Sequence, residues 1–224
     1  MVIRSSEYPL SGLIRGMALF LLAVAPGRAG IVFFQGTFDA DNEVALFDFT
    51  ANAPETVSIQ TYSYGGGTVG STTIPSGGFA PTAFIFDNLG NVITLTNGTC
   101  SQVAQDPVTS NCDDLFYQDT LGPGTFTLAL AVYDNRPVDT TLSDGFVQDA
   151  NPGFTCQEAG TGGSFCDVTT ALGTSRTGDY AISISGADSV FQGEAPEPGS
   201  ILLLLTGGAW MVLQGRLGFK FRES

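Results

Sequence analysis

Residues 125–133 read TFTLALAVY, and this stretch decides the expected fold. Successive side chains of a β-strand point to opposite faces of the sheet, so Leu128 and Leu130 would share one face while Ala129 and Ala131 share the other. Both faces are then apolar over most of the run. Strands of this kind lie inside a sheet that is covered on both sides. The stretch therefore predicts a central strand.

Short runs rich in Val, Ile, Phe, Tyr and Thr surround this strand, and Gly, Pro, Asn and Asp separate them. They are residues 32–38, 44–49, 56–62, 83–86, 92–95, 115–117 and 180–184. No segment between residues 30 and 193 keeps a helical period, and the glycine-rich stretches 65–78 and 160–163 are expected to be turns. At least eight short strands with turn signals between them predict an all-β fold, a single jelly-roll-like β-sandwich.

Two of the runs alternate clearly. In residues 56–62, Val57, Ile59 and Thr61 fall on one face and the intervening residues on the other. In residues 180–184, Tyr180, Ile182 and Ile184 share a face that we expect to be covered only in part.

The chain begins with the features of a secretory signal peptide. Arg4 and Arg15 precede the short apolar stretch MALFLLAV, residues 17–24, and small residues at Gly27 and Ala29 suit cleavage before Gly30. Residues 1–29 are therefore predicted to be a signal peptide, with an uncleaved anchor as the alternative.

A second apolar segment lies near the C-terminus. Residues 201–213 carry no charge and would form about 20 Å of helix, and residues 199–217 would form about 28 Å, close to the ~30 Å hydrocarbon core of a membrane. Arg216, Lys220 and Arg222 follow, which predicts a transmembrane helix with a cytoplasmic C-terminus. The alternative is a C-terminal helix buried in the core.

The region between these segments is strongly acidic. Twenty of the 22 acidic residues and two of the eight basic residues lie in residues 30–198, so this region has a formal charge of −18. Such a body would be repelled by nucleic acid and by anionic membrane surfaces, and it would attract divalent cations. Its many aromatic and β-branched residues favour a packed domain over disorder.

The four cysteines form two closely spaced pairs. Cys100 and Cys112 are 12 residues apart, and Cys156 and Cys166 are 10 apart. Their spacing differs from that of a zinc site, and four cysteines allow three disulfide pairings. We expect the two local disulfides, in an oxidising compartment, each stabilising the fold by roughly 2–3 kcal/mol.

The chain has no histidine, which excludes Ser-His-Asp and Cys-His nucleophiles and histidine-ligated zinc. A carboxylate-based glycoside hydrolase is a remaining enzymatic alternative. A calcium site is another candidate, because Asp39, Asp41 and Glu43 alternate and would share one side of an extended segment. The alternative is that these three residues form a solvent-exposed acidic strand edge without a metal ion.

A carbohydrate-binding module is the second functional class. Aromatic side chains at the surface of a β-sandwich can stack on sugar rings, and five are candidates: Tyr62, Tyr64, Phe79, Phe116 and Tyr117. Most aromatic residues in such positions belong to the core, and Trp210 in the tail is the only tryptophan in the chain.

The C-terminal segment resembles a PEP-CTERM sorting signal. The resemblance consists of Pro196, Glu197 and Pro198, the apolar residues 201–213 and the basic tail, although the tail is less dense in arginine than is usual in that family. It implies an exported protein of a Gram-negative bacterium, recognised by the membrane transpeptidase exosortase. Such proteins are held in the membrane and then pass to the cell surface or to an exopolysaccharide matrix.

Several segments of the middle region are similar to ectodomains of PEP-CTERM proteins and to bacterial pre-peptidase C-terminal β-sandwiches. They are residues 36–49, 61–67, 78–81, 121–125, 133–135 and 144–146. The resemblance implies a non-catalytic domain, in some cases one that binds calcium. The expected organisation is a signal peptide at 1–29, an ectodomain at 30–193 and a sorting and anchor segment at 194–224.

Overall fold

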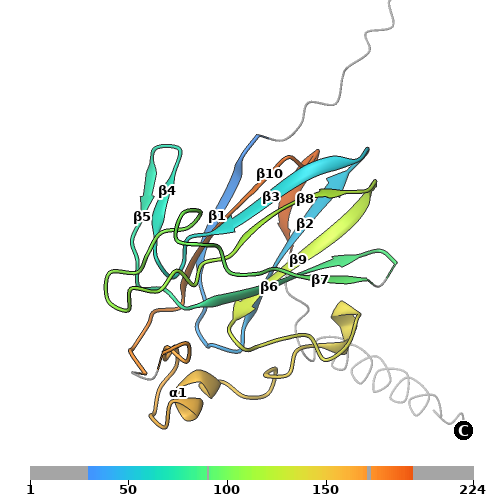
Figure 1. The fold of residues 1–224 in the computed structure, drawn as a ribbon. Coiled ribbons are helices and arrows are strands. Elements are labelled where there is room, and N and C mark those ends of the chain that lie inside the picture. The colour runs from blue at the N-terminus through green and yellow to red at the C-terminus, as the bar shows by residue number, and fades with distance from the viewer. Residues whose placement is uncertain (1–29, 90, 171–172, 194–224) are drawn as a thin grey trace, which may run out of the picture.

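The structure is a computed structural model that describes residues 30–89, 91–170 and 173–193. In these ranges the chain forms two antiparallel sheets and a short separate hairpin (Figure 1). The predicted signal peptide at 1–29 and the sorting and anchor segment at 194–224 lie outside the described residues. Across the ranges that are described, none of the helices has the length and apolar character needed to span a bilayer.

The sheets are built as follows. The first sheet has the order β1 (Val32–Thr37), β10 (Asp179–Ser185), β3 (Glu55–Thr61) and β8 (Phe116–Leu121). The second has the order β11 (Ser189–Gly193), β2 (Val44–Ala51), β9 (Gly124–Val132), β6 (Pro81–Asp87) and β7 (Val92–Thr94). The hairpin pairs β4 (Gly67–Val69) with β5 (Thr72–Ile74).

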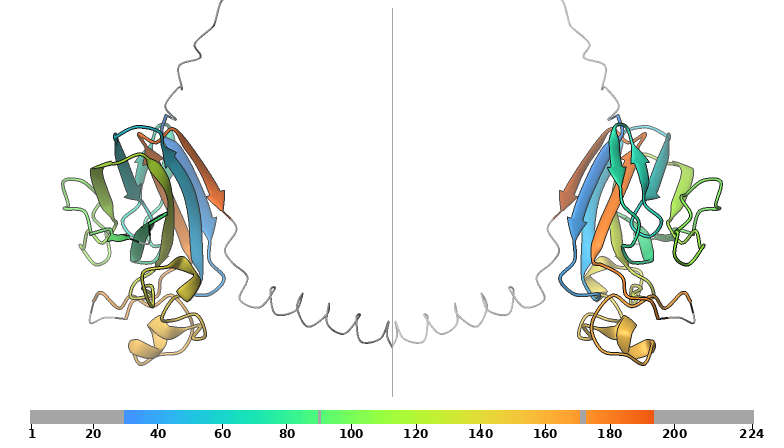
Figure 2. Two further views of the ribbon diagram at one scale, coloured as in Figure 1. Left: turned by 90° about the vertical axis from the view of Figure 1, so that its right-hand side faces the viewer. Right: turned by 90° about the vertical axis from the view of Figure 1, so that its left-hand side faces the viewer.

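The predicted central strand is confirmed. β9 lies in the middle of the five-stranded sheet, between β2 and β6, and pairs antiparallel with both. The other predicted runs correspond to β1, β2, β3, β6, β7, β8 and β10. The two sheets face each other as layers, which confirms the expected β-sandwich at this coarse level (Figure 2).

The main core lies between the two layers. Ile59 of the first sheet and Phe47 and Leu128 of the second are completely buried in one continuous apolar cluster. Tyr180 and Ile184 belong to the same cluster, at 7% and 0% exposure. The expectation that their face of β10 is only partly covered is therefore wrong: the second sheet covers it.

A smaller apolar cluster explains why β9 is apolar on both faces. Leu46, Phe84 and Ala129 lie on the outer face of the five-stranded sheet, and Phe146 covers them, with its ring centroid 6.5 Å from that of Phe84. Phe146 belongs to the loop that follows β9. This loop also carries a short 3-10 helix, η1 (Leu142–Asp144).

Several short elements differ from the sequence-based expectation. The stretch 65–78 contains the β4–β5 hairpin, whose two-residue loop starts at Gly70 with φ +59. A two-residue Gly-Ser loop between two strands is typical of a β-hairpin. The edge strand β11 and the five-residue helix α1 (Phe154–Glu158) were also not expected, since both are too short to show a period.

Candidate functional site

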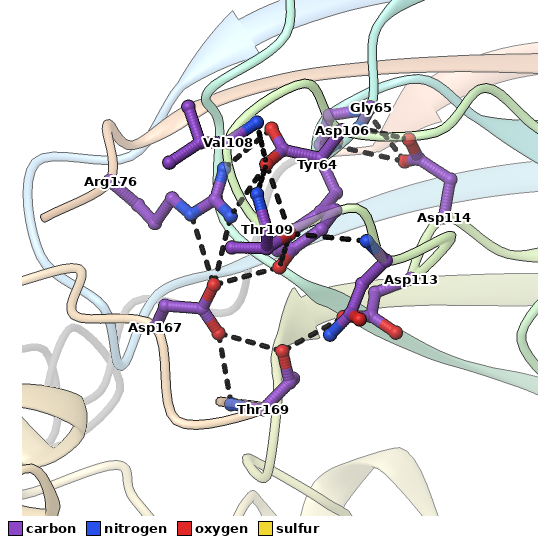
Figure 3. A network of polar contacts seen from close by, with 12 residues as sticks. Tyr64, Gly65, Asp106, Val108, Thr109, Asp113, Asp114, Asp167, Thr169 and Arg176 are labelled. Atoms are coloured by element: carbon purple, nitrogen blue, oxygen red, sulfur yellow. Dashed lines mark hydrogen bonds and ion pairs between the residues drawn. The ribbon is translucent and has the colours of Figure 1, made fainter. Parts of the chain in front are cut away.

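Two groups of polar side chains in the described part of the chain are candidates for a functional site. One is a buried ionic network between three loops, shown in Figure 3. The other is a cleft on the outer side of the four-stranded sheet. The two differ in what they can do chemically, and only the second is open to a ligand.

The centre of the buried network is Arg176, just before β10. Its side chain is 3% exposed and lies between Asp106, at 3.0 Å, and Asp167, at 2.8 Å. The two carboxylate side chains are 1% and 0% exposed. The guanidinium also lies 4.0 Å from the centroid of the Tyr64 ring, which adds a cation–π contact (Figure 3).

Neutral groups complete this network. The Tyr64 hydroxyl donates to Asp167 at 2.7 Å and lies 2.8 Å from the Thr109 hydroxyl. The Thr169 hydroxyl lies 2.7 Å from an Asp167 oxygen and 2.8 Å from an Asp113 oxygen, and its one hydrogen is shared between them. The loops around residues 106, 167 and 176 are thus tied together through direct hydrogen bonds.

Asp114 fixes the neighbouring backbone. It is completely buried and accepts hydrogen bonds from the Thr61 hydroxyl and from the amides of Ser63, Tyr64 and Gly65, at 2.7–3.2 Å. Burial raises the pKa of Asp114, and these hydrogen bonds offset part of that effect. The chain thereby turns sharply after β3, and Tyr64 is directed into the network.

The surroundings of Asp106 and Asp167 favour their ionised forms. Burial acts to raise the pKa of Asp106 and of Asp167, but hydrogen bonds from Arg176 and the neighbouring threonines outweigh it and leave both values below normal. Burial also raises the pKa of Tyr64 to about 12. A glycoside hydrolase needs one carboxyl that stays protonated, whereas both carboxyls here are held ionised. The network stabilises loops and has no acid–base pair.

The expected calcium ligands do not form one set. Residues 39–42 form a bend and a turn and not an extended segment, so the expectation that Asp39, Asp41 and Glu43 share one side is wrong. Asp41 is completely buried. Within the described ranges, no three Asp, Glu, His or Cys side chains are grouped closely enough to hold a metal ion.

Asp41 has a different role. Its carboxylate accepts hydrogen bonds from the amides of Gly153 and Thr155 and from the Thr155 hydroxyl, the latter two at 2.9 and 2.6 Å. It therefore caps the start of α1 from a distant part of the chain. Glu43 accepts instead from the amides of Asp39 and Ala40, at 3.2 Å each, within its own turn.

The predicted disulfides are confirmed. Cys100 is bonded to Cys112 and Cys156 to Cys166, with S–S distances of 2.04 and 2.00 Å. The first closes the loop that carries Asp106. The second joins Cys156 within α1 to Cys166, beside Asp167. The sorting residues Pro196, Glu197 and Pro198 and the basic residues Arg216, Lys220 and Arg222 lie outside the described residues.

The structure separates the aromatic candidates for sugar binding. Tyr64 and Phe79 are buried at 0% and 1% exposure, so neither can reach a ligand at the surface. Tyr117 packs against the main core, and its hydroxyl is buried. Phe116 and Tyr62 are half-buried, and of the five candidates only Tyr62 lines the cleft.

The cleft has a volume of about 410 Å³ and lies where the ends of β1, β3 and β10 meet the segment that follows β5. Its polar lining residues include Gln35, Thr37, Tyr62, Ser76, Thr177 and Asp179. Its volume lies in the range of small-molecule sites, about 300–1,000 Å³. Sequence reasoning singled out Tyr62 but missed the others, because they come from four separate segments.

The sequence was compared with protein-family models and with curated proteins. No family model matches it. No curated protein matches it either. The chemistry of the cleft and the sequence features described above therefore carry the functional argument.

Proposed function

We propose that this chain is an exported, non-catalytic surface protein, sorted through a PEP-CTERM signal, whose β-sandwich associates with extracellular polysaccharide. We infer that residues 1–29 direct export and that residues 194–224 hold the chain in the membrane until exosortase acts on the segment Pro196–Pro198. The protein then reaches the cell surface or the extracellular matrix of a Gram-negative bacterium.

The observation that carries this proposal is the state of the cysteines. All four are joined in two local disulfides, a pattern that persists in oxidising compartments outside the cytoplasm. The acidic composition of residues 30–198 supports the same conclusion, because a body of charge −18 stays soluble and does not adsorb to nucleic acid or anionic lipid.

We further infer that the sandwich is a jelly roll. Strands β1, β10, β3 and β8 lie opposite β2, β9, β6 and β7, and successive strands mostly alternate between the two sheets. This is the arrangement expected of two interlocking Greek keys, with β11 added beside β2. Such folds present a broad sheet face on which a ligand can bind.

The second candidate function is that of a carbohydrate-binding module. It is favoured by the polar cleft on the outer side of the four-stranded sheet, where Tyr62 lies beside hydroxyl, amide and carboxylate groups. The buried Asp106–Arg176–Asp167 network does not favour a glycoside hydrolase at that place, because Arg176 and the neighbouring threonines hold the pKa of both carboxyls below its usual range. Calcium has no preferred site among the residues first considered for it.

Cell fractionation tests the export proposal. The wild-type protein is expected in the surface or matrix fraction, with no free thiols and without the residues that follow the sorting motif, as read by mass spectrometry of its C-terminus. A triple variant with alanine at Pro196, Glu197 and Pro198 should instead stay in the membrane with Ser224 intact. A Pro152→Ala variant serves as the control and should behave as the wild type. Wild-type protein found in the cytosol with reduced cysteines would refute the proposal.

A further inference from the structure

We propose that the cleft on the outer side of the four-stranded sheet binds one or two rings of an uncharged saccharide, with Tyr62 as the stacking surface and Gln35 and Asp179 as hydrogen-bonding partners. This inference rests on the proposed association with polysaccharide and assigns it a site and a ligand class.

Tyr62 provides an aromatic surface held in a defined position. It follows β3, and its hydroxyl lies 3.3 Å from the hydroxyl of Ser183 on β10. A Cβ atom placed on Gly67 would lie 2.9 Å from the Tyr62 ring, so the start of the β4–β5 hairpin packs directly on that ring. The ring is half-buried and still lines the cleft. A ring fixed in this way loses little conformational entropy when a sugar stacks on it.

Asp179 provides a fixed acceptor beside this ring. One carboxylate oxygen accepts from the Thr37 hydroxyl at 2.7 Å and the other from the Thr177 hydroxyl at 2.9 Å. The carboxylate is exposed, and each oxygen can accept a further hydrogen bond. Adjacent hydroxyls of a sugar ring are donors that suit such an acceptor.

Gln35 and Ser76 add groups that both donate and accept. Both side chains are exposed on the cleft, and neither makes a side-chain hydrogen bond to any part of the described chain. A sugar hydroxyl also both donates and accepts, so an amide and a hydroxyl are the neutral partners that it matches. An apolar ligand would leave these groups unpaired.

The floor of the cleft is rigid. The Gly78 amide donates to the Ser63 carbonyl at 2.9 Å, and the Thr177 amide donates to the Gly77 carbonyl at 3.0 Å. A Cβ atom on Gly78 would lie 2.3 Å from the carbonyl oxygen of Asp179 and 2.6 Å from that of Ser63. The backbones of these three segments are therefore packed too closely for any side chain at residue 78. The site is therefore formed before a ligand arrives.

Charge selects the class of saccharide. The region between residues 30 and 198 has only two basic residues, Arg136 and Arg176. Arg176 is buried between two carboxylates, and Arg136 pairs with Asp134 at 3.4 Å. Neither lines the cleft, where Asp179 is the charged group. An acidic sugar would meet a carboxylate with no cation to offset it, and it would have to enter a strongly anionic domain. An uncharged sugar avoids this repulsion.

Isothermal titration calorimetry of the exported, oxidised protein tests the proposal. The uncharged probes are cellotriose, maltotriose, laminaritriose, mannotriose and N-acetylated chitotriose, with trigalacturonic acid as the acidic probe and the deacetylated chitosan trimer as the cationic probe. At least one uncharged trisaccharide is expected to bind, and trigalacturonic acid is not. Stronger binding of the acidic or the cationic probe than of every uncharged probe would overturn the assignment.

Three variants locate the binding in the cleft. Tyr62→Ala should weaken binding of the best uncharged probe by about tenfold, while Tyr62→Phe keeps the ring and most of the affinity. Gln35→Ala should weaken it by about fivefold. Gln118→Ala is the matched control, because Gln118 is also exposed but lies on β8 outside the cleft, and it should bind as the wild type.

The outcomes separate this inference from the proposed function. Unchanged affinity in both Tyr62→Ala and Gln35→Ala would place the sugar elsewhere and refute the cleft. Failure of every trisaccharide to bind, while the protein still co-fractionates with the matrix, refutes the cleft but leaves the proposed function standing. Thermal unfolding of each variant shows whether the fold is retained, and Gln35→Ala alters only an exposed side chain.

Discussion

Replacement of Arg176 by methionine should destabilise the protein strongly. The arginine side chain is 3% exposed and neutralises two carboxylates that are 1% and 0% exposed. Methionine fills a similar volume but leaves Asp106 and Asp167 buried without a cation. Removing one partner of a buried ion pair costs about 3–5 kcal/mol in unfolding free energy. For a domain of this size, such a loss lowers Tm by about 6–20 °C.

The loss should depend on pH in a definite direction. In the wild type the pKa values of Asp106 and Asp167 lie below those of the unfolded chain, so their contribution to stability is present above about pH 4 and is lost as the pH falls through the folded values. In the variant, buried carboxyls without Arg176 should have raised pKa values. The variant therefore gains stability as the pH falls toward about 4, and the two unfolding free energies converge.

Urea unfolding of the oxidised protein between pH 7 and pH 4 measures this difference. Arg136→Met is the matched control: Arg136 and Asp134 form an ion pair whose side chains are 63% and 43% exposed, and exposed pairs contribute little, so its stability should stay close to that of the wild type. The reasoning is refuted if the two variants lose the same stability at pH 7, or if the loss in Arg176→Met grows as the pH falls.

Three further changes test other parts of the structure. Asp41→Ala should lower the unfolding free energy by about 2–3 kcal/mol, because it leaves the buried start of α1 without its hydrogen-bond acceptor. Asp39→Ala is the control and should change the unfolding free energy little. Equal losses of the two variants in urea unfolding would contradict the capping role of Asp41. Phe146→Ala should cost about 3 kcal/mol and increase binding of an apolar dye, since it uncovers the outer face of the five-stranded sheet; an unchanged Tm would contradict this cover. Replacing Cys100 and Cys112 together by serine should cost about 3 kcal/mol, and thermal unfolding with unchanged Tm would contradict the stabilising role of that disulfide.

Local patterns in the sequence predicted most of the strands. Residues 125–133 indicated the central strand, and alternation in residues 56–62 put Val57 and Ile59 on one face, which the structure shows to be buried. Both signals reflect the two-residue period of a strand, which depends only on neighbouring residues. The short elements β4, β5 and β11 were missed because strands of three to five residues show too little alternation to be recognised among glycines and turns.

The predicted site residues had mixed outcomes for a related reason. The two disulfides were predicted correctly because each joins cysteines close in sequence. Asp41 was expected to share one side of an extended segment with Asp39 and Glu43, yet it binds the start of α1 more than 110 residues away, a contact that no local pattern encodes. The sorting residues at 196–198 stay a prediction.

The sequence alone determined the alternation of polar and apolar residues, the acidic charge and the cysteine spacing, because each of these is a property of neighbouring residues or of composition. Tertiary structure alone decided which polar groups meet. Arg176 lies between Asp106 and Asp167, and Gln35 shares a cleft with Tyr62, only because the pairing of distant strands brings their loops together. In the sequence, these polar residues cannot be distinguished from solvent-exposed ones. Their chemical environment is set by burial and by neighbouring groups, which only the tertiary structure provides.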